Sequence, residues 1–385
     1  MSERARIYLD YAATAPIKTE VIAAMQAASN TAQFNASSLH AEGRAARALL
    51  DEARAHIGEL LGASRKEITF TASGTEADHL AITGTVRALG RSAHVVAAAI
   101  EHHAVLHALD ELRERGCEVT LVPVDAEGRV DPVRFGAALR DDTALACVMY
   151  ANNEIGSIAP IADLAAIAHE RGSLFHTDAV QAPNWLPLDV GRLGIDTLAL
   201  SAHKFGGPRG VGVLYVRAGT PIVAAIPGGG QEFGRRSGTE NVVGIAGAAT
   251  ALELAAGARE ENFRRIGGLR DRLEAGVLAT IPNVRVNAGG SPRLPSISSC
   301  SFAGVDPAAA LMRCDLEGLA VSAGSACTSG TLEPSHVIRA IGGDVASATL
   351  RFSLGETTTA AEIERVLAIL PNAVAALRGT GAGVK

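Results

Sequence analysis

A lysine lies at the mouth of a glycine-rich stretch, residues 201–212, between two apolar segments. The flanking segments 197–200 and 213–216 each have the length and composition of a buried strand. Burial among small residues would lower the pKa of the Lys204 amine, and a neutral amine can form a Schiff base with an aldehyde cofactor. A lone lysine in a glycine-rich turn is more often an exposed residue, so the chemical interpretation depends on the other polar clusters.

A second cluster, Thr71-Ala-Ser-Gly-Thr-Glu76, joins the end of a predicted strand to the start of a predicted helix. The first amides of such a helix are not used in its internal hydrogen bonds. Together with the helix dipole and the hydroxyls of Ser73 and Thr75, they form a site for an anion. The alternative is an ordinary N-cap, in which a hydroxyl and an acid only stabilise the helix start.

A carboxylate ends a third such segment, Phe175-His-Thr-Asp-Ala-Val-Gln181. An aspartate at this place can pair with a protonated pyridine nitrogen and so turn the ring into an electron sink. Gln181 is close enough in sequence to reach a phenolic oxygen of the same ring. The alternative role for Asp178 is to cap a helix.

Three histidines follow another predicted strand, in residues 100–107. His102 could lie flat against a cofactor ring. His103 and His107 have the spacing of one helix face, which would suit a metal ion. Because no acidic or third ligand accompanies them in the manner of known zinc motifs, we predict no metal site.

Two further residues are candidates near the C-terminal end of the chain. Cys327 stands among small polar residues with glycines on both sides, and no apolar periodicity would bury it, so we expect an exposed loop. A free thiol is only a few per cent thiolate near neutral pH, so a reactive one needs local help that the sequence does not show. Arg351 lies inside a strand pattern, where an arginine either extends to solvent or clamps a carboxylate with two hydrogen bonds.

These clusters are separated by alternating apolar strands and amphipathic helices from about residue 68 to residue 176. Such alternation predicts an α/β fold with a mostly parallel sheet covered by helices, and ligands bind at the carboxyl ends of its strands. From about residue 255 the pattern changes to longer helices, 260–280 and 359–377, with a few strands between them. We therefore predict a large domain, 15–255, and a smaller α/β domain, 256–385, completed by residues 1–14.

Composition limits the possible partners. The chain has 385 residues, of which 48% are hydrophobic and 20% charged, and its formal net charge is -6. A nucleic-acid or membrane partner is therefore not expected, and no apolar run approaches the roughly 18 residues of a membrane span. The first residues lead into no apolar secretion segment, which favours a cytoplasmic location. The five cysteines are odd in number and widely spaced, so neither a disulfide frame nor a zinc site is predicted.

Taken together and in this order, the motifs resemble the pyridoxal-phosphate enzymes of aminotransferase class V, and more narrowly the cysteine desulfurases of the NifS/IscS type. The likeness spans nearly the whole chain and implies the PLP-dependent transferase fold type I. The segments that carry it are 9–14, 73–76, 101–102, 152–154, 178–181, 201–212, 236–239 and 325–329, together with Arg351.

The resemblance also implies roles for single residues. The catalytic residues would be Lys204, Cys327 and His102. Lys204 would bind pyridoxal 5'-phosphate covalently and later move the substrate α-proton, and Cys327 would be the sulfur nucleophile. Arg351, Asn35 and Asn153 would bind the substrate. The other cofactor contacts would come from Gly74, Thr75, Ser201 and His203 at the phosphate, from His102, Asn153, Asp178 and Gln181 around the ring, and from Thr239 of the other subunit of a homodimer.

The implied reaction converts L-cysteine to L-alanine and leaves the sulfur on Cys327 as a persulfide, for transfer to an acceptor protein in iron–sulfur cluster assembly or thiolation. A selenocysteine lyase or another class V β-lyase is the alternative enzyme, and a sulfur carrier that kept only the fold is the non-enzymatic one. The family's Asn-Pro-x-Ser turn here has Ala36 after Asn35, which leaves the turn less rigid. The chain also stops soon after its last predicted helix, so we expect weaker docking to an iron–sulfur scaffold than in relatives with a longer tail.

Overall fold

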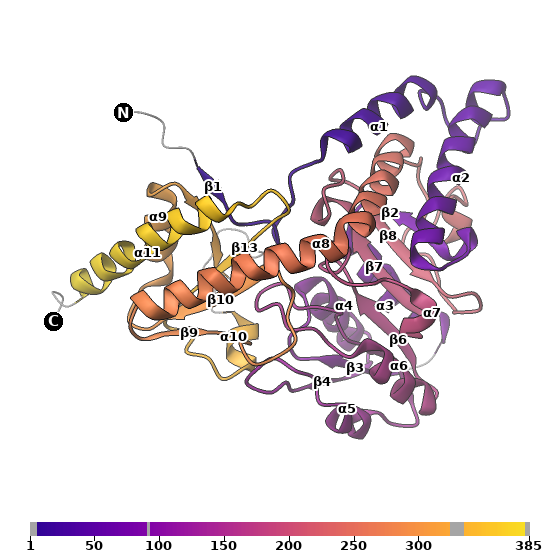
Figure 1. The fold of residues 1–385 in the computed structure, drawn as a ribbon. Helices are drawn as coiled ribbons and strands as arrows, with labels where there is room; N and C mark the ends of the chain where they lie inside the picture. Colours follow the sequence, from indigo (N-terminus) through magenta and orange to yellow (C-terminus); the bar gives the residue numbers. More distant parts are fainter. Residues whose placement is uncertain (1–5, 91–92, 324–334, 382–385) are drawn as a thin grey trace.

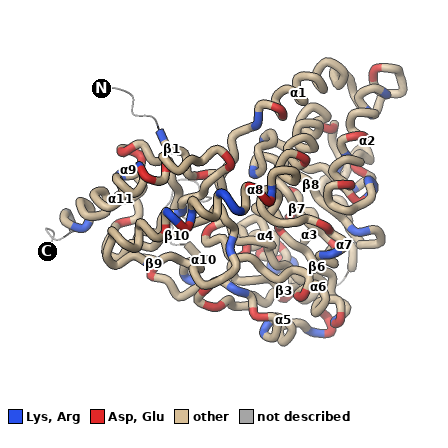
Figure 2. The backbone as a smooth tube through the Cα atoms, viewed as in Figure 1, with Lys and Arg blue, Asp and Glu red and all other residues tan. Residues whose placement is uncertain are grey.

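The computed structural model describes residues 6–90, 93–323 and 335–381. Its elements form a larger group around a seven-stranded sheet and a smaller group around a four-stranded sheet. Helix α8 (Val242–Thr280) runs alongside both groups (Figure 1). Lys and Arg residues are interspersed with Asp and Glu residues over the helices and loops (Figure 2).

The seven-stranded sheet confirms the prediction of a mostly parallel arrangement. Its strand order is β2-β8-β7-β6-β5-β3-β4, and β8 is antiparallel to both of its neighbours. The reversal follows from the connection before it, since residues 202–211 are fewer than the dozen or so that a parallel crossover needs. The strands are β2 (Ile68–Thr71), β3 (His94–Ala98), β4 (Glu118–Val122), β5 (Thr143–Cys147), β6 (Leu174–Asp178), β7 (Thr197–Ser201) and β8 (Gly212–Val216).

Helices cover both faces of this sheet, which is why its strands are apolar on both sides. Strand β3 illustrates the arrangement. Val95 and Ala97 pack in the cluster that contains α3 and α4, whereas Val96 and Ala98 belong to the main core with α5 and α6. The bounds of these helices are α3 (Gly74–Ala88), α4 (His103–Glu114), α5 (Pro132–Ala138) and α6 (Ile161–Glu170).

Helix α8 begins at Val242, eighteen residues before the helix start that the sequence predicts. By length and composition alone it could cross a membrane, but half of its most apolar stretch is buried. Helix α8 packs on α1 (Thr19–Thr31) and α2 (Ala41–Leu61). The short helix α7 (Val190–Leu193) also belongs to the larger group and contacts α6. Because α8 passes unbroken through the predicted boundary at 255/256, the division into two domains stays a prediction.

The smaller group joins distant parts of the chain. The central pair of its sheet is β10 (Ile297–Phe302) with β13 (Ala348–Ser353), flanked by β9 (Val284–Val286) and β12 (Ser322–Ala323). Near the N-terminus, β1 (Ile7–Tyr8) pairs in parallel with β11 (Leu319–Ala320). The helices of this group are α9 (Pro307–Leu316), α10 (His336–Ala340) and α11 (Ala360–Gly381).

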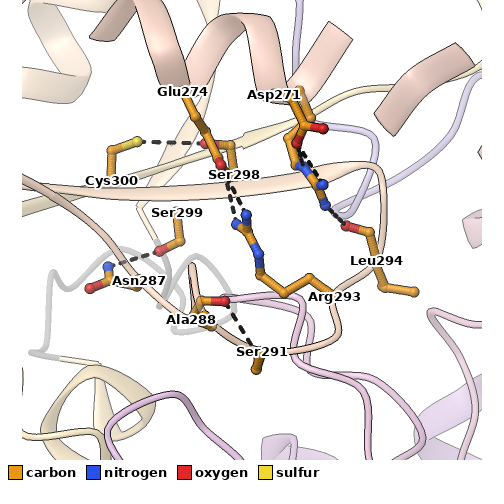
Figure 3. A network of polar contacts seen from close by, with 12 residues as sticks. Asp271, Glu274, Asn287, Ala288, Ser291, Arg293, Leu294, Ser298, Ser299 and Cys300 are labelled. Carbon is orange, nitrogen blue, oxygen red and sulfur yellow. Dashed lines mark hydrogen bonds and ion pairs between the residues drawn. The ribbon is translucent and has the colours of Figure 1, made fainter. Parts of the chain in front are cut away.

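A largely buried ion pair fastens the loop between β9 and β10 to α8. Both terminal nitrogens of Arg293 donate to the carboxylate of Glu274, at 2.8 and 2.9 Å (Figure 3). The same loop is hydrogen-bonded to the segment between β5 and α6, because the amide of Leu294 donates to the carbonyl of Gly156 at 2.8 Å. The ion pair therefore helps to hold the segment that carries Asn153.

Candidate active site

A cavity of about 330 Å³ lies at the carboxyl ends of β6 and β7. Parallel strands bring their carboxyl ends to one edge of a sheet, so polar residues that follow different strands meet there. Most of the residues singled out in the sequence line this cavity: Gly74, Thr75, His102, Asn153, Asp178, Gln181, Ser201, His203, Lys204 and Arg351.

Lys204 ends a short 3-10 helix, Ala202–Lys204, directly after β7. Its Nζ donates to the backbone carbonyls of Ala12 and Ala13, at 2.7 and 2.9 Å. The carbonyl of Ala12 also accepts a hydrogen bond from the side-chain amide of Gln181, at 3.0 Å. The turn at residues 10–14 thus forms one wall of the cavity and holds the amine. The motif at 9–14 was expected only as part of the family resemblance, and its contact with Lys204 has no signal in the sequence.

The N-terminus of α3 supplies an anion site. Ser73 caps the helix by accepting a hydrogen bond from the amide of Glu76 at 3.1 Å. The amides of Gly74 and Thr75 have no hydrogen-bond acceptor within the described part of the protein. This is expected, because the first amides of a helix have no partner within the helix. A Cβ on Gly74 would lie 2.9 Å from Val180 Cγ2 and 3.1 Å from Ser201 Cβ, so this first residue of the helix fits against its neighbours because it is glycine.

Asp178 is a buried carboxylate at the end of β6, 5% exposed. The amide of Val180 donates to its Oδ1 at 2.9 Å. Burial raises the pKa of Asp178 to about 6, and the Val180 amide and the Lys204 ammonium partly oppose this rise. A cation placed beside this carboxylate would compensate for its burial, so the position suits a protonated ring nitrogen.

Two imidazoles of the cavity are neutral at physiological pH. Burial lowers the pKa of His102 to about 4, and the positive charge of Lys204 adds to this effect. His102 Nδ1 caps α4 by accepting from the amide of Ala104 at 3.1 Å, which leaves the proton on Nε2. Burial likewise lowers the pKa of His203 to about 4, and its Nδ1 lies 3.0 Å from the hydroxyl of Thr14.

Arg351 reaches the cavity from β13 in the smaller group, and it is 3% exposed. One terminal nitrogen donates to the carbonyl of Asn153 at 2.8 Å, and the other donates to Oδ1 of Asp10 at 2.9 Å. The residue predicted to clamp a substrate carboxylate therefore already holds a carboxylate of its own chain. Asp10 was not among the predicted site residues, although it lies inside the motif at 9–14.

A family model for aminotransferase class-V matches residues 7–366. The chain belongs to the aminotransferase class-V family. It is 45% identical to a cysteine desulfurase IscS of Dictyoglomus turgidum over 375 residues, which cover 97% of this chain and 95% of the relative. A solved structure described as a NifS-like protein superposes with a TM-score of 0.90 at 33% identity, covering 97% of this chain and all of that one. Another, described as SspA in complex with cysteine, has a TM-score of 0.78 at 33% identity, covering 90% and 98% of the two chains.

Membership in the class V family identifies the fold as the type I fold of PLP-dependent transferases. The family's cysteine desulfurases are pyridoxal-phosphate enzymes. The cofactor presents a phosphate, a ring nitrogen and an aldehyde. This cavity offers the uncovered helix start at Gly74, the buried carboxylate of Asp178 and the primary amine of Lys204. The residues present therefore fit the cofactor.

Two predicted site residues that the structure describes, Asn35 and Thr239, do not line this cavity. Asn35 is exposed, and its side chain accepts from the amide of Ser37 at 2.8 Å in a local turn. Thr239 is exposed at a separate cavity of about 170 Å³, which Arg236 and Asn241 also line. Cys327 lies outside the described residues. The roles assigned to these three residues stay predictions.

Proposed function

We propose that this chain is a pyridoxal-phosphate-dependent L-cysteine desulfurase. The observation that carries the proposal is the meeting of Lys204, Asp178 and Arg351 in one cavity of a class V chain. Its relatives support the choice of substrate, because a full-length relative at 45% identity is a cysteine desulfurase and a neighbouring structure is described in complex with cysteine.

The residues that would hold the cofactor fall into three sets, one for each group of the cofactor. The amine of Lys204 would bind the aldehyde. Asp178 would pair with the ring nitrogen, and His102, Asn153 and Gln181 would lie around the ring. Gly74, Thr75, Ser201 and His203 would hold the phosphate, as the free amides of a helix start favour an anion. When bound, pyridoxal phosphate withdraws electrons from the substrate's α-carbon and so makes its C–H and C–S bonds easier to break.

The protein's own groups then act on the substrate. Arg351 binds the amino acid through its carboxylate, in a bidentate pair that fixes the orientation of the α-carbon. The amine of Lys204 would take up the α-proton of the substrate and return a proton to it. The carbonyls of Ala12 and Ala13 accept hydrogen bonds from this amine and so keep it near the substrate.

Sulfur transfer is assigned to Cys327. Its thiolate attacks the sulfur of L-cysteine, so that L-cysteine and one protein thiol become L-alanine and one protein persulfide, with no other oxidant or reductant. Three other cysteines are buried and poorly suited to this step. Burial raises the pKa of Cys300 to about 12 and that of Cys314 to about 11, and it raises the pKa of Cys147 as well. A buried neutral thiol is a weak nucleophile.

The proposal extends to the assembly and to the acceptor. A homodimer in which Thr239 contacts the partner's cofactor is supported by the exposure of Thr239 at a cavity apart from Lys204. The sulfur would pass to an acceptor protein of iron–sulfur cluster assembly or thiolation, in the cytoplasm.

The test uses the cofactor-loaded protein mixed with L-cysteine. We expect L-alanine and sulfide in the presence of a thiol reductant, and one added sulfur atom on the Cys327 peptide by mass spectrometry. Cys327→Ser should abolish sulfide while keeping the visible absorbance of the cofactor, whereas the matched variant Cys117→Ser should be fully active. Full activity of Cys327→Ser would contradict the proposal, and so would a clear preference for L-selenocysteine.

A further inference from the structure

The contact between Arg351 and Asp10 places a carboxylate of the protein on the group assigned to the substrate carboxylate. The distance between Arg351 Nη2 and Asp10 Oδ1 is 2.9 Å. Arg351 lines the cavity, and Asp10 lies two residues before Ala12, which also lines it. Two carboxylates at one guanidinium repel each other. A substrate carboxylate must therefore share Arg351 with Asp10 or displace it.

The two partners differ in how firmly they are held. Arg351 is 3% exposed and is fixed by the carbonyl of Asn153 as well as by Asp10. Its Nε is buried without a hydrogen-bond partner among the described residues, so the guanidinium keeps unused donor capacity. The side chain of Asp10 is 22% exposed, and it has solvent to turn into.

The backbone of Asp10 is held independently of its carboxylate. Its carbonyl accepts from the hydroxyl of Tyr8 at 3.1 Å and from the amide of Ala13 at 3.0 Å. The turn that supports Lys204 therefore does not depend on the Asp10 carboxylate. A neutral, isosteric side chain can replace it without removing these bonds.

We propose that Asp10 is a specificity-determining residue that competes with the substrate carboxylate for Arg351. The inference rests on the proposed function, because it takes the substrate to be an amino acid bound at this cavity. When no substrate is bound, Asp10 neutralises the buried guanidinium. During binding the substrate carboxylate replaces it, so only ligands that carry a full negative charge gain the contact.

The test is a calorimetric titration of the cofactor-loaded protein with L-alanine, and separately with L-alaninamide, in which the carboxylate is replaced by a neutral amide. Asp10→Asn keeps a hydrogen-bond acceptor for Arg351 and removes the charge. We expect it to bind L-alanine roughly three- to tenfold more tightly than the wild type, as removal of a competing charge contact should. Its affinity for L-alaninamide should stay within about twofold of the wild type.

The matched control is Glu356→Gln, which removes the same charge from the Lys18–Glu356 pair and does not contact Arg351. We expect it to leave both affinities unchanged. A second variant, Asp10→Ser, removes the same charge with a smaller side chain, and we expect the same changes in affinity as for Asp10→Asn. It allows the test to be made even if one of the two variants folds poorly. Weaker or unchanged L-alanine binding would overturn the inference, as would equal tightening for the amide.

These titrations need no sulfur release. If the wild type binds L-alanine with the expected Asp10 dependence but releases no sulfide from L-cysteine, the proposed function fails and the inference on Asp10 stands. If sulfide is released and the Asp10 dependence is missing, the inference alone fails.

Discussion

Arg54 and Glu232, 178 residues apart in sequence, form a buried ion pair in which both terminal guanidinium nitrogens donate to the carboxylate, at 2.6 and 2.7 Å. Both side chains are at most 2% exposed. Glu232 also accepts from the amide of Phe70 at 2.8 Å, and the Arg54 guanidinium lies over the ring of Phe70. The pair thus joins α2, β2 and the segment that leads to Thr239.

Glu232→Gln should therefore lower the free energy of unfolding by about 3–5 kcal/mol, since it leaves the Arg54 charge buried without a counter-ion. Urea denaturation measures the change. The control Asp51→Asn removes an exposed partner of Arg47 and should cost at most about 1 kcal/mol. An equal decrease in the free energy of unfolding in the two variants would contradict the prediction, because it would show that the buried pair stabilises the fold no more than an exposed pair does.

Gly74→Ala should weaken cofactor binding while the protein stays folded. The added Cβ would lie within 3.1 Å or less of Val180 and Ser201, and both residues line the cavity beside the proposed phosphate site. We expect loss of the visible cofactor absorbance on dialysis, with at least tenfold weaker rebinding, the equivalent of about 1.4 kcal/mol. Gly257→Ala, in α8 with no atom within 4 Å of the new Cβ, should bind the cofactor normally.

The sequence predicted most of the cavity because its signals are local. Asp178 and Ser201 end predicted strands, and Gly74 begins a helix after another strand. In a parallel sheet such positions converge whatever the exact strand order. The structure brings them together at the lining of one cavity.

Other features had no local signal. The pairing of Arg54 with Glu232, and that of Asp10 with Arg351, join residues far apart in sequence, and an ion pair of this kind leaves no periodicity in either segment. The first half of α8 was missed because its alanine- and glycine-rich sequence follows a glycine-rich loop, and its helical state is stabilised by packing on α1 and α2. Tertiary contacts outweigh propensity there.

His102 should make the cofactor-free protein sensitive to acid. Its pKa is about 4 in the folded protein, below the ordinary value near 6.5, so the unfolded chain binds the extra proton first as the pH falls. Folding stability should decrease by roughly 2–3 kcal/mol from this residue between about pH 6.5 and pH 4. His102→Asn keeps an N-cap acceptor and cannot titrate. A denaturation series across this range should show a smaller loss in the variant, and an identical loss would contradict the assignment.

Asp178 should act in the opposite direction in the same cofactor-free protein. Burial raises its folded pKa to about 6, above the unfolded value near 3.9, so the folded protein holds the proton more tightly. Its ionisation therefore costs stability as the pH rises from about 4 to about 6, and the full cost, roughly 3 kcal/mol, persists above that range. Asp178→Asn retains an acceptor for the Val180 amide without the charge. At pH 8 the cofactor-free variant should thus be more stable than the wild type, and the difference should shrink toward zero near pH 4, where the wild-type carboxyl is also neutral.

Urea denaturation at both pH values checks this, with Asp51→Asn as the exposed control. A difference that stays constant with pH, or a variant less stable at pH 8, would show that burial does not control the charge of this carboxyl. In the cofactor-loaded protein the sign should reverse, because the carboxylate then has the proposed ring nitrogen as its partner and the asparagine does not.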